Sequence, residues 1–296
     1  MTGRAFCKRM NQRSGTVRRP ALALCVLGSL ALAGCSTLAN PDSEAKNDAL
    51  YATSQSNLAS LTEVIQKHPE DPQAYNTRGS VLAEAGQSEA ALADFNKAIS
   101  LDPNYAQAYA NRALLYRQAN KLELALADYN KALSIDASYA PAYLGRGIIY
   151  RQQGRGVQAL GDFNKAIALR PDNAQAYYQR GLLYQSQHQH HFAIDDFSTS
   201  IGLVKQKAEP FVARALSYLA IGDNKSAASD LDEAVQIDPS NQQAWTSRGL
   251  AYERLGQKNK AAGSYAKALN INDKYEPART GFARVGGKAG QSYETF

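Results

Sequence analysis

The chain has 296 residues, of which 33 are Lys or Arg and 27 are Asp or Glu, giving a net charge of +6. Six of the basic residues and none of the acidic ones lie before residue 35, so the two signs balance in the remainder of the chain. The basic total therefore gives no reason to expect nucleic-acid binding. Cys7 and Cys25 lie in the same stretch, which leaves Cys35 alone and excludes an intramolecular disulfide beyond it.

Residues 1–34 have the features of a bacterial secretory signal peptide. Basic residues precede an apolar run over residues 21–33, which is shorter than the roughly 20 residues that a membrane-spanning helix needs. The sequence Leu-Ala-Gly-Cys ending at Cys35 resembles the lipobox of bacterial lipoproteins. That resemblance implies cleavage before Cys35, acylation of that residue (palmitate included) and a lipid anchor. An ordinary signal peptide cut near Cys35 and a twin-arginine route through Arg18 and Arg19 are the alternatives.

Residues 35–54 are polar and are predicted to be a flexible tether. In lipoproteins of this kind an Asp after the lipidated Cys favours the inner membrane, so Ser36 favours the outer membrane and the periplasm. The inner membrane and the cell surface are the alternatives. Residues 55–71 carry Leu58, Leu61, Val64 and Ile65 at helical spacing and are predicted to be an N-terminal capping helix.

A period of 34 residues organises the middle of the chain. Six units occupy residues 72–105, 106–139, 140–173, 174–207, 208–241 and 242–275, without insertion or deletion. Position 4 of each unit is aromatic, position 8 is Gly or Ala, and position 15 is Gly, Asn or His. Positions 4 and 8 lie on one face of a helix. The residue at position 15 can adopt the left-handed conformation that ends a helix. Each unit is therefore predicted to be a helix-turn-helix.

The unit at residues 140–173 shows the full pattern, namely Tyr143, Gly147, Tyr150, Ala159, Phe163, Ala166 and Pro171. This pattern resembles the tetratricopeptide repeat family over residues 72–275. The resemblance implies an all-α, right-handed α-solenoid that binds protein partners and needs no cofactor. Residues 276–286 are predicted to be a C-terminal capping helix and residues 287–296 a disordered tail.

Position 7, commonly Leu in that family, is Arg in all six units, and position 23 is Asp in the first five. We predict structural Arg–Asp pairs, joining the two helices of a unit or adjacent units, rather than a stripe of arginines that captures an anion. The predicted pairs are Arg78–Asp94, Arg112–Asp128, Arg146–Asp162, Arg180–Asp196 and Arg214–Asp230. Arg248 lacks its Asp, because position 23 of the sixth unit is Ser264.

The turn of the fourth unit holds His188, His190 and His191. Three histidines so close together could bind Zn²⁺ or Cu²⁺, but no Cys or further His completes a ligand set. We therefore expect a solvated turn and no metal site, with a metal-binding protein as the alternative.

First helices line the concave face in the family, so a partner-binding groove is predicted there. Its predicted residues are Asn76, Leu114, Arg117, Leu144, Ile148, Arg151, Tyr178, Leu182, Val212, Leu216 and Leu219. Packing between units is the competing role for some of these side chains. The family's clamp for a free carboxyl terminus is not expected. Ser80 occupies a position where the clamp needs Asn, and Pro141 and Gly145 occupy positions where it needs basic residues.

The sequence contains no arrangement typical of a catalytic site, such as Gly-x-Ser-x-Gly or His-Glu-x-x-His. We predict a non-enzymatic, lipid-anchored periplasmic scaffold for cell-envelope proteins, with peptidoglycan enzymes or proteases as candidate partners. The alternative is a subunit of an outer-membrane assembly or export complex. Self-association is left open, and nucleic acid is not expected as a partner.

Overall fold

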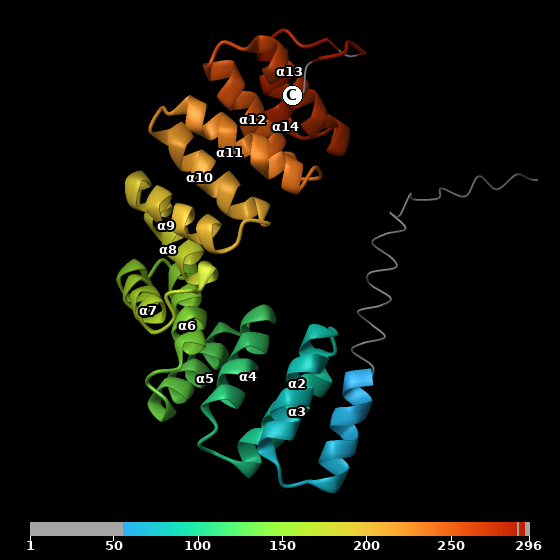
Figure 1. Cartoon of the computed structure of the whole chain (residues 1–296), viewed down its shortest axis with the longest axis vertical. Coiled ribbons are helices and arrows are strands. Elements are labelled where there is room, and N and C mark those ends of the chain that lie inside the picture. Colours follow the sequence, from blue (N-terminus) through green and yellow to red (C-terminus); the bar gives the residue numbers. More distant parts are fainter. Residues whose placement is uncertain (1–55, 289, 294–296) are drawn as a thin grey trace, which may run out of the picture. The chain divides into compact units, whose positions relative to one another are not determined.

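The computed structural model describes residues 56–288 and 290–293, and within them all regular structure is helical (Figure 1). The predicted signal peptide, the lipidated Cys35 and the tether over residues 35–54 lie outside the described residues. The predicted all-α helical-repeat fold is confirmed for the part of the chain that the structure describes.

A helix over residues 56–67 comes first. The helices that follow are α2 (Pro72–Glu84), α3 (Ser88–Leu101), α4 (Ala106–Gln118), α5 (Leu122–Ile135), α6 (Ala140–Gln152), α7 (Gly156–Leu169), α8 (Ala174–Ser186), α9 (His190–Leu203), α10 (Ala208–Ala220), α11 (Asn224–Ile237), α12 (Gln242–Arg254), α13 (Lys258–Ile271) and α14 (Glu276–Arg284). Each unit has a first helix, which we call its A helix (even numbers from α2 to α12), and a second, its B helix (odd numbers from α3 to α13).

The turn between the A and B helices forms at position 15 of each unit. Its backbone is left-handed in all six units, with φ between +56° at Asn120 and +82° at Gly222. Gly adopts this conformation without steric cost, and Asn and His tolerate it better than most residues. The prediction that A helices end here is confirmed, including at His188, where φ is +58°.

A second short turn joins each B helix to the next A helix. At four of these junctions the carboxylate or amide oxygen of position 31 accepts a hydrogen bond from the backbone N–H two residues later. The four residues are Asp102, Asp136, Asp238 and Asn272. These local bonds stop the B helix and direct the chain back towards the next unit.

The A and B helices of a unit approach closely because position 8 is small. A Cβ atom built on Gly147 would lie 2.8 Å from the ring of Phe163, and one on Gly249 would lie 2.6 Å from the ring of Tyr265. The Ala at position 20 of every unit is fully buried at the same contact. In five of the six units the core is therefore an aromatic ring packed against small residues, and Leu231 takes the place of the ring in the fifth unit.

Neighbouring units contact each other unequally along their two sides. Each A helix touches the next A helix and the preceding B helix, whereas successive B helices do not touch. The A helices therefore form the closely packed side of the array, and the B helices spread apart on the other side. A surface made of A helices is built from several consecutive units, which suits the binding of an extended segment.

Helices outside the six units cover both ends of the array. Leu58, from the helix over residues 56–67, packs against the cluster that contains Leu82 and Phe95. At the other end α14 packs on α12 and α13. In the predicted disordered tail, the structure places the ring of Tyr293 edge-on against Phe282, with centroids 5.7 Å apart, so part of this segment lies on α14.

Candidate partner-binding surface on the A helices

The arginines at position 7 are bound by the Asp residues at position 23 in the first five units. Arg146 donates from Nε and from a terminal nitrogen to the two oxygens of Asp162, both at 2.8 Å. The other four pairs have the same two-bond geometry, with distances of 2.7 or 2.8 Å. The hydrogen bond to Asp162 raises the pKa of Arg146. Each pair joins the A helix to the B helix of its own unit.

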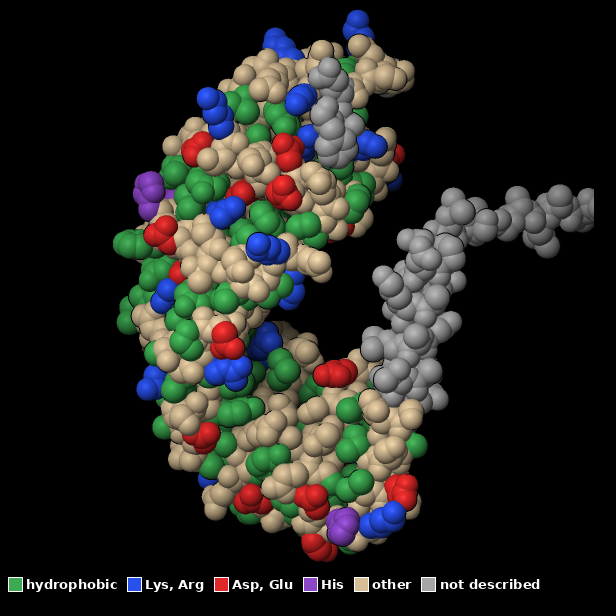
Figure 2. Space-filling model, in the orientation of Figure 1, with side chains coloured by type: hydrophobic (Ala, Val, Ile, Leu, Met, Phe, Trp, Pro, Cys, Tyr) green, Lys and Arg blue, Asp and Glu red, His purple; other side chains and the backbone are tan. Residues whose placement is uncertain are grey.

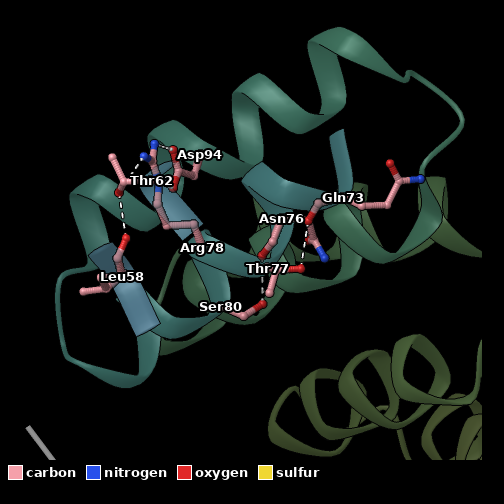
Figure 3. A network of polar contacts seen from close by, with 8 residues as sticks. All are labelled: Leu58, Thr62, Gln73, Asn76, Thr77, Arg78, Ser80 and Asp94. Atoms are coloured by element: carbon pink, nitrogen blue, oxygen red, sulfur yellow. Dashed lines mark hydrogen bonds and ion pairs between the residues drawn. The ribbon is translucent and has the colours of Figure 1, made fainter. Parts of the chain in front are cut away.

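The third nitrogen of these arginines reaches the preceding B helix. Arg112, Arg146 and Arg180 donate to the side-chain oxygens of Asn96, Asn130 and Asn164, at 2.6 or 2.7 Å. In the first unit the equivalent acceptor is Thr62, 3.3 Å from Arg78, so the helix over residues 56–67 takes the place of a B helix (Figure 3). The arginines at position 7 therefore join the two helices of their own unit and also join adjacent units, so both predicted arrangements occur.

Aromatic side chains flank each guanidinium group. The Arg112 group lies 5.5 Å from the ring centroid of Tyr109 and 5.8 Å from that of Tyr116. Those rings occupy positions 4 and 11, and the same contacts recur in the later units. The arginines at position 7 are thus held by acceptors within the chain and by cation–π contacts. This arrangement suits a structural role and not the binding of an external anion.

The sixth unit corrects the prediction that Arg248 lacks an acidic partner. Arg248 is only 1% exposed and donates from Nε to Asp232 of the preceding unit at 2.6 Å. Its terminal nitrogen donates to Ser264 at 2.9 Å. The acidic partner of Arg248 therefore comes from position 25 of the preceding unit, where earlier units carry Asn or Ser, and not from position 23 of its own unit. The acidic residue at position 25 was the feature of the sequence that indicated this pairing.

Fewer of the predicted groove residues are accessible than the sequence suggested. Asn76, Ile148, Val212 and Leu219 are all buried. Asn76 accepts a hydrogen bond from Asn111 at 2.9 Å, which joins the first two A helices. These four residues pack between units, because neighbouring A helices touch on this side, and they are removed from the set of primary contact residues. Leu114 is 38% exposed, and Leu144, Tyr178, Leu182 and Leu216 are half-buried.

A pocket of about 250 Å³ lies on this surface between α4 and α6. Its walls include Leu114 and Arg117 from α4 and Leu144 and Ile148 from α6. A second pocket, of about 390 Å³, lies at the junction of the fourth and fifth units and includes Tyr178. Pockets of this size hold one or a few side chains, so this surface offers separate subsites to a bound segment.

Two arginines at position 12 lie half-buried on the same surface. The Nε atoms of Arg117 and Arg151 are buried and have no hydrogen-bond partner among the described residues. Within that same part of the chain, no carboxylate lies at ion-pair distance from either group. Burial lowers the pKa of Arg151 below its usual value. These two cations contrast with the fully engaged arginines at position 7.

Tyr129 brings a polar atom to Arg117 from the B helix of the same unit. Its ring is buried against Gly145, where an added Cβ would lie 2.2 Å from Cζ. Burial raises the pKa of Tyr129, and the nearby positive charge of Arg117 opposes that rise. Because Gly145 has no side chain, the ring and hydroxyl of Tyr129 can lie against α6 at this position.

The histidine turn offers no complete ligand set. His188 and His190 have ring centroids 6.0 Å apart. Across the described residues, no group of three or more His, Cys, Asp or Glu side chains is arranged to hold a metal ion. The metal-binding alternative therefore gains no support from this turn.

Charges of both signs are mixed over the face of the repeats drawn in Figure 2. Of the helices that the structure describes, none combines the length and apolar character needed to cross a membrane. The face drawn in Figure 2 thus lacks the single-sign field that is typical of nucleic-acid binding.

Paired helices of constant length, stacked in register and capped at both ends, define an α-solenoid of the helical-repeat class. Two family profiles, described as TPR repeat and Tetratricopeptide repeat, match residues 79–118, 113–154 and 147–187, and residues 212–277. The chain belongs to the tetratricopeptide repeat family. It is therefore a protein-interaction scaffold by architecture.

Solved structures agree with this assignment. YrrB, described as a TPR protein with an unusual peptide-binding site, is 28% identical with a TM-score of 0.55, over 63% of this chain and 96% of YrrB. Pseudomonas aeruginosa PilF is 20% identical with a TM-score of 0.66, over 72% of this chain and 97% of PilF. A tetratricopeptide repeat protein from Parabacteroides merdae is 20% identical with a TM-score of 0.55, over 83% of this chain and 97% of its own. The last two show a shared fold. A search of curated proteins gave no match.

Proposed function

We propose that this protein is a non-enzymatic, lipid-anchored scaffold of the bacterial cell envelope that binds peptide segments of partner proteins along its A helices. The observation that carries the binding role is the half-open surface of α4, α6 and α8. Apolar side chains and Arg117 line one pocket there, and Tyr178 lines another. Neither Arg117 nor Arg151 has an acidic partner among the residues that the structure describes. The peptide-binding site named for YrrB supports a peptide as ligand. Peptidoglycan enzymes and proteases are the proposed partners.

The anchoring part of the proposal rests on the Leu-Ala-Gly-Cys sequence ending at Cys35 and on Ser36 after it. The overall design, a lipoprotein signal followed by tetratricopeptide repeats, resembles that of the envelope lipoprotein NlpI. We place the repeats in the periplasm, on the outer membrane.

Replacing Cys35 with Ala is expected to abolish lipid attachment and to move the protein from the membrane fraction, because the side chain that accepts the lipid is removed. Incorporation of labelled palmitate, with membrane fractionation of expressing bacteria, measures both effects. The matched control is Ser36→Ala, which keeps the acylated residue and should label normally. Equal labelling of wild type and Cys35→Ala would contradict the anchor, and membrane association without any label would point to a protein receptor.

The binding role is tested by photo-crosslinking in cells with p-benzoylphenylalanine at position 178. Tyr178 lines the 390 Å³ pocket, and the aromatic probe approximates its shape. We expect adducts with envelope proteins from this position. The control position is Lys97, which is exposed on the B helix α3 and should give few or none of the same adducts.

The identity of the adducts decides between the functions. Peptidoglycan enzymes or proteases captured from position 178 alone would support the scaffold proposed here. Subunits of a barrel-assembly or export complex would replace it with the alternative drawn from the sequence. Capture of only the protein's own chain, or equal capture from both positions, would contradict an A-helix surface open to partners.

A further inference from the structure

One arrangement of side chains occurs twice in this protein, with different residues at position 12 and at position 9 of the following helix. A Tyr at position 24 packs against a Gly at position 6 of the next A helix, and its hydroxyl lies beside position 12 of its own A helix. The first case is Tyr129 with Gly145 and Arg117, and the second is Tyr265 with Gly281 and Glu253. A Cβ on either Gly would lie 2.2 or 2.3 Å from the tyrosine Cζ, so the packing is the same in both.

In the second case the charge at position 12 is neutralised within the chain. The hydroxyl of Tyr265 donates to Glu253 at 2.8 Å, and Arg284 of α14 donates to the same carboxylate at 2.8 Å. Arg284 stands at position 9 of the following helix. The hydrogen bond from Arg284 lowers the pKa of Glu253 below its usual value. A carboxylate from α12, a phenol from α13 and a guanidinium from α14 thus satisfy one another within the chain.

In the first case one member of this set is missing. Arg117 supplies the guanidinium and Tyr129 the phenol, but position 9 of the following helix is the apolar Ile148. Arg151, one unit further, has the apolar Leu182 at its corresponding position. A half-buried cation without a counter-ion is costly, and a carboxylate brought by a ligand would relieve that cost.

We propose, on the basis of the peptide-binding function above, that Arg117 and Arg151 form a subsite for an Asp or Glu side chain of a partner segment whose neighbouring residues are apolar. The carboxylate of the ligand would accept hydrogen bonds from these arginines, as Glu253 does from Arg284 at the sixth unit. Leu114 and Leu144 line the pocket of about 250 Å³ that Arg117 also lines, and they contact the apolar neighbours.

The surroundings of the subsite favour a peptide acid over a nucleic acid. A nucleic-acid strand carries a charge at every nucleotide and is matched by rows of cations. Here Arg117 and Arg151 are the basic residues at position 12, and the other position 12 residues are Ala83, Gln185, Leu219 and Glu253. A single carboxylate between apolar side chains fits this pattern. The subsite also differs from a clamp for a chain terminus, because a side-chain acid satisfies it.

The test uses the full-length lipidated protein in detergent and pairs of fluorescent 13-residue peptides. Each peptide has an amidated C-terminus and a central Glu or Gln between Leu and Ala residues, with the flanks varied across the set. Fluorescence anisotropy measures the ratio of Kd for Gln to Kd for Glu within each pair. Since hydrogen bonds between charged groups are stronger than neutral ones, we expect a ratio of about 10 or more for pairs that bind wild type.

Arg117→Gln with Arg151→Gln is expected to bring that ratio to about 1, because only the acidic peptides use the two charges. Arg155→Gln is the matched control, since Arg155 is exposed in the same unit as Arg151 and lies outside the pockets; it should leave the ratio unchanged. Arg117→Glu should reverse the preference, towards peptides with a central Lys. Circular dichroism establishes that each variant keeps its helices.

Equal binding of the Glu and Gln peptides, or a ratio of 10 that survives in the double variant, would overturn the subsite. If Leu144→Ser weakens both peptides of such a pair, the A-helix surface still binds peptide and the broader proposal stands. Inorganic phosphate that displaces the Glu peptides at micromolar concentration would also overturn the inference and assign the two arginines to a phosphate group.

Discussion

Replacing Asp162 with Ser is expected to destabilise the protein by about 3 kcal/mol, because Arg146 would keep a largely buried charge without its carboxylate. Asp162 is 6% exposed and accepts two hydrogen bonds from Arg146, so water cannot readily take its place. The loss is measured by urea denaturation followed by circular dichroism. Hydrogen exchange should locate it in the second and third units, because repeat arrays respond locally to such changes.

The sixth unit supplies the rescue for this substitution. Adding Asn130→Asp to Asp162→Ser would give Arg146 the partners that Arg248 has, a carboxylate at position 25 of the preceding unit and a Ser at position 23. Arg146 already donates to Asn130 at 2.7 Å, so the new charge would lie in contact. We expect the double variant to recover at least half of the lost free energy of unfolding.

The control replaces Asp by Ser in an exposed ion pair. Asp172 lies 3.2 Å from Arg170, and both side chains are more than half exposed. Asp172→Ser should leave the free energy of unfolding almost unchanged, because exposed ion pairs contribute little to stability. A similar small effect at Asp162, or a double variant no more stable than Asp162→Ser alone, would contradict the structural role of the Arg–Asp pairs.

Replacing Gly145 with Ala is expected to destabilise the protein by about 2 kcal/mol, since the added methyl group would lie 2.2 Å from a carbon of the buried Tyr129 ring. Denaturant unfolding measures the change. Gly161→Ala is the matched control, because Gly161 lies in the helix α7 with nothing within 4 Å of the added Cβ. There the same substitution should stabilise the protein by up to about 1 kcal/mol, the usual gain of Ala over Gly in a helix.

In a Tyr129→Leu background, Gly145→Ala is expected to cost less stability than in the wild type, because Leu lacks the Cε1, Cζ and hydroxyl atoms that the added Cβ would meet. The fifth and sixth units already combine Leu231 at position 24 with Ser247 at position 6 of the next A helix. A double-mutant cycle measures the coupling between the two sites. Additive effects of the two substitutions, or stabilisation by Gly145→Ala alone, would show that the tyrosine ring does not fix the residue at position 145.

The period, the turns and the Arg–Asp pairs were readable from the sequence because each depends on contacts at a constant spacing. A left-handed turn residue recurs every 34 residues, and both partners of a pair recur together, 16 residues apart. Asp232 was missed although its signal was present, as the one acidic residue at a position that is Asn or Ser in four earlier units. The Tyr129–Gly145 contact also had a signal, since a Tyr at position 24 is followed by Gly at position 6 of the next helix in both cases.

The sequence by itself determined the class of fold, the ends of the A helices and the acids that pair with five arginines, because these follow from the hydrophobic period, turn geometry and charge at fixed spacing. Only the tertiary structure decided which predicted groove residues remain accessible. Ile148 and Val212 are buried while Leu114 and Leu144 stay partly open, although all four have the same apolar character. The physical reason is that exposure on this surface is set by how closely each A helix packs on the next, and that depends on pairs of residues in different units.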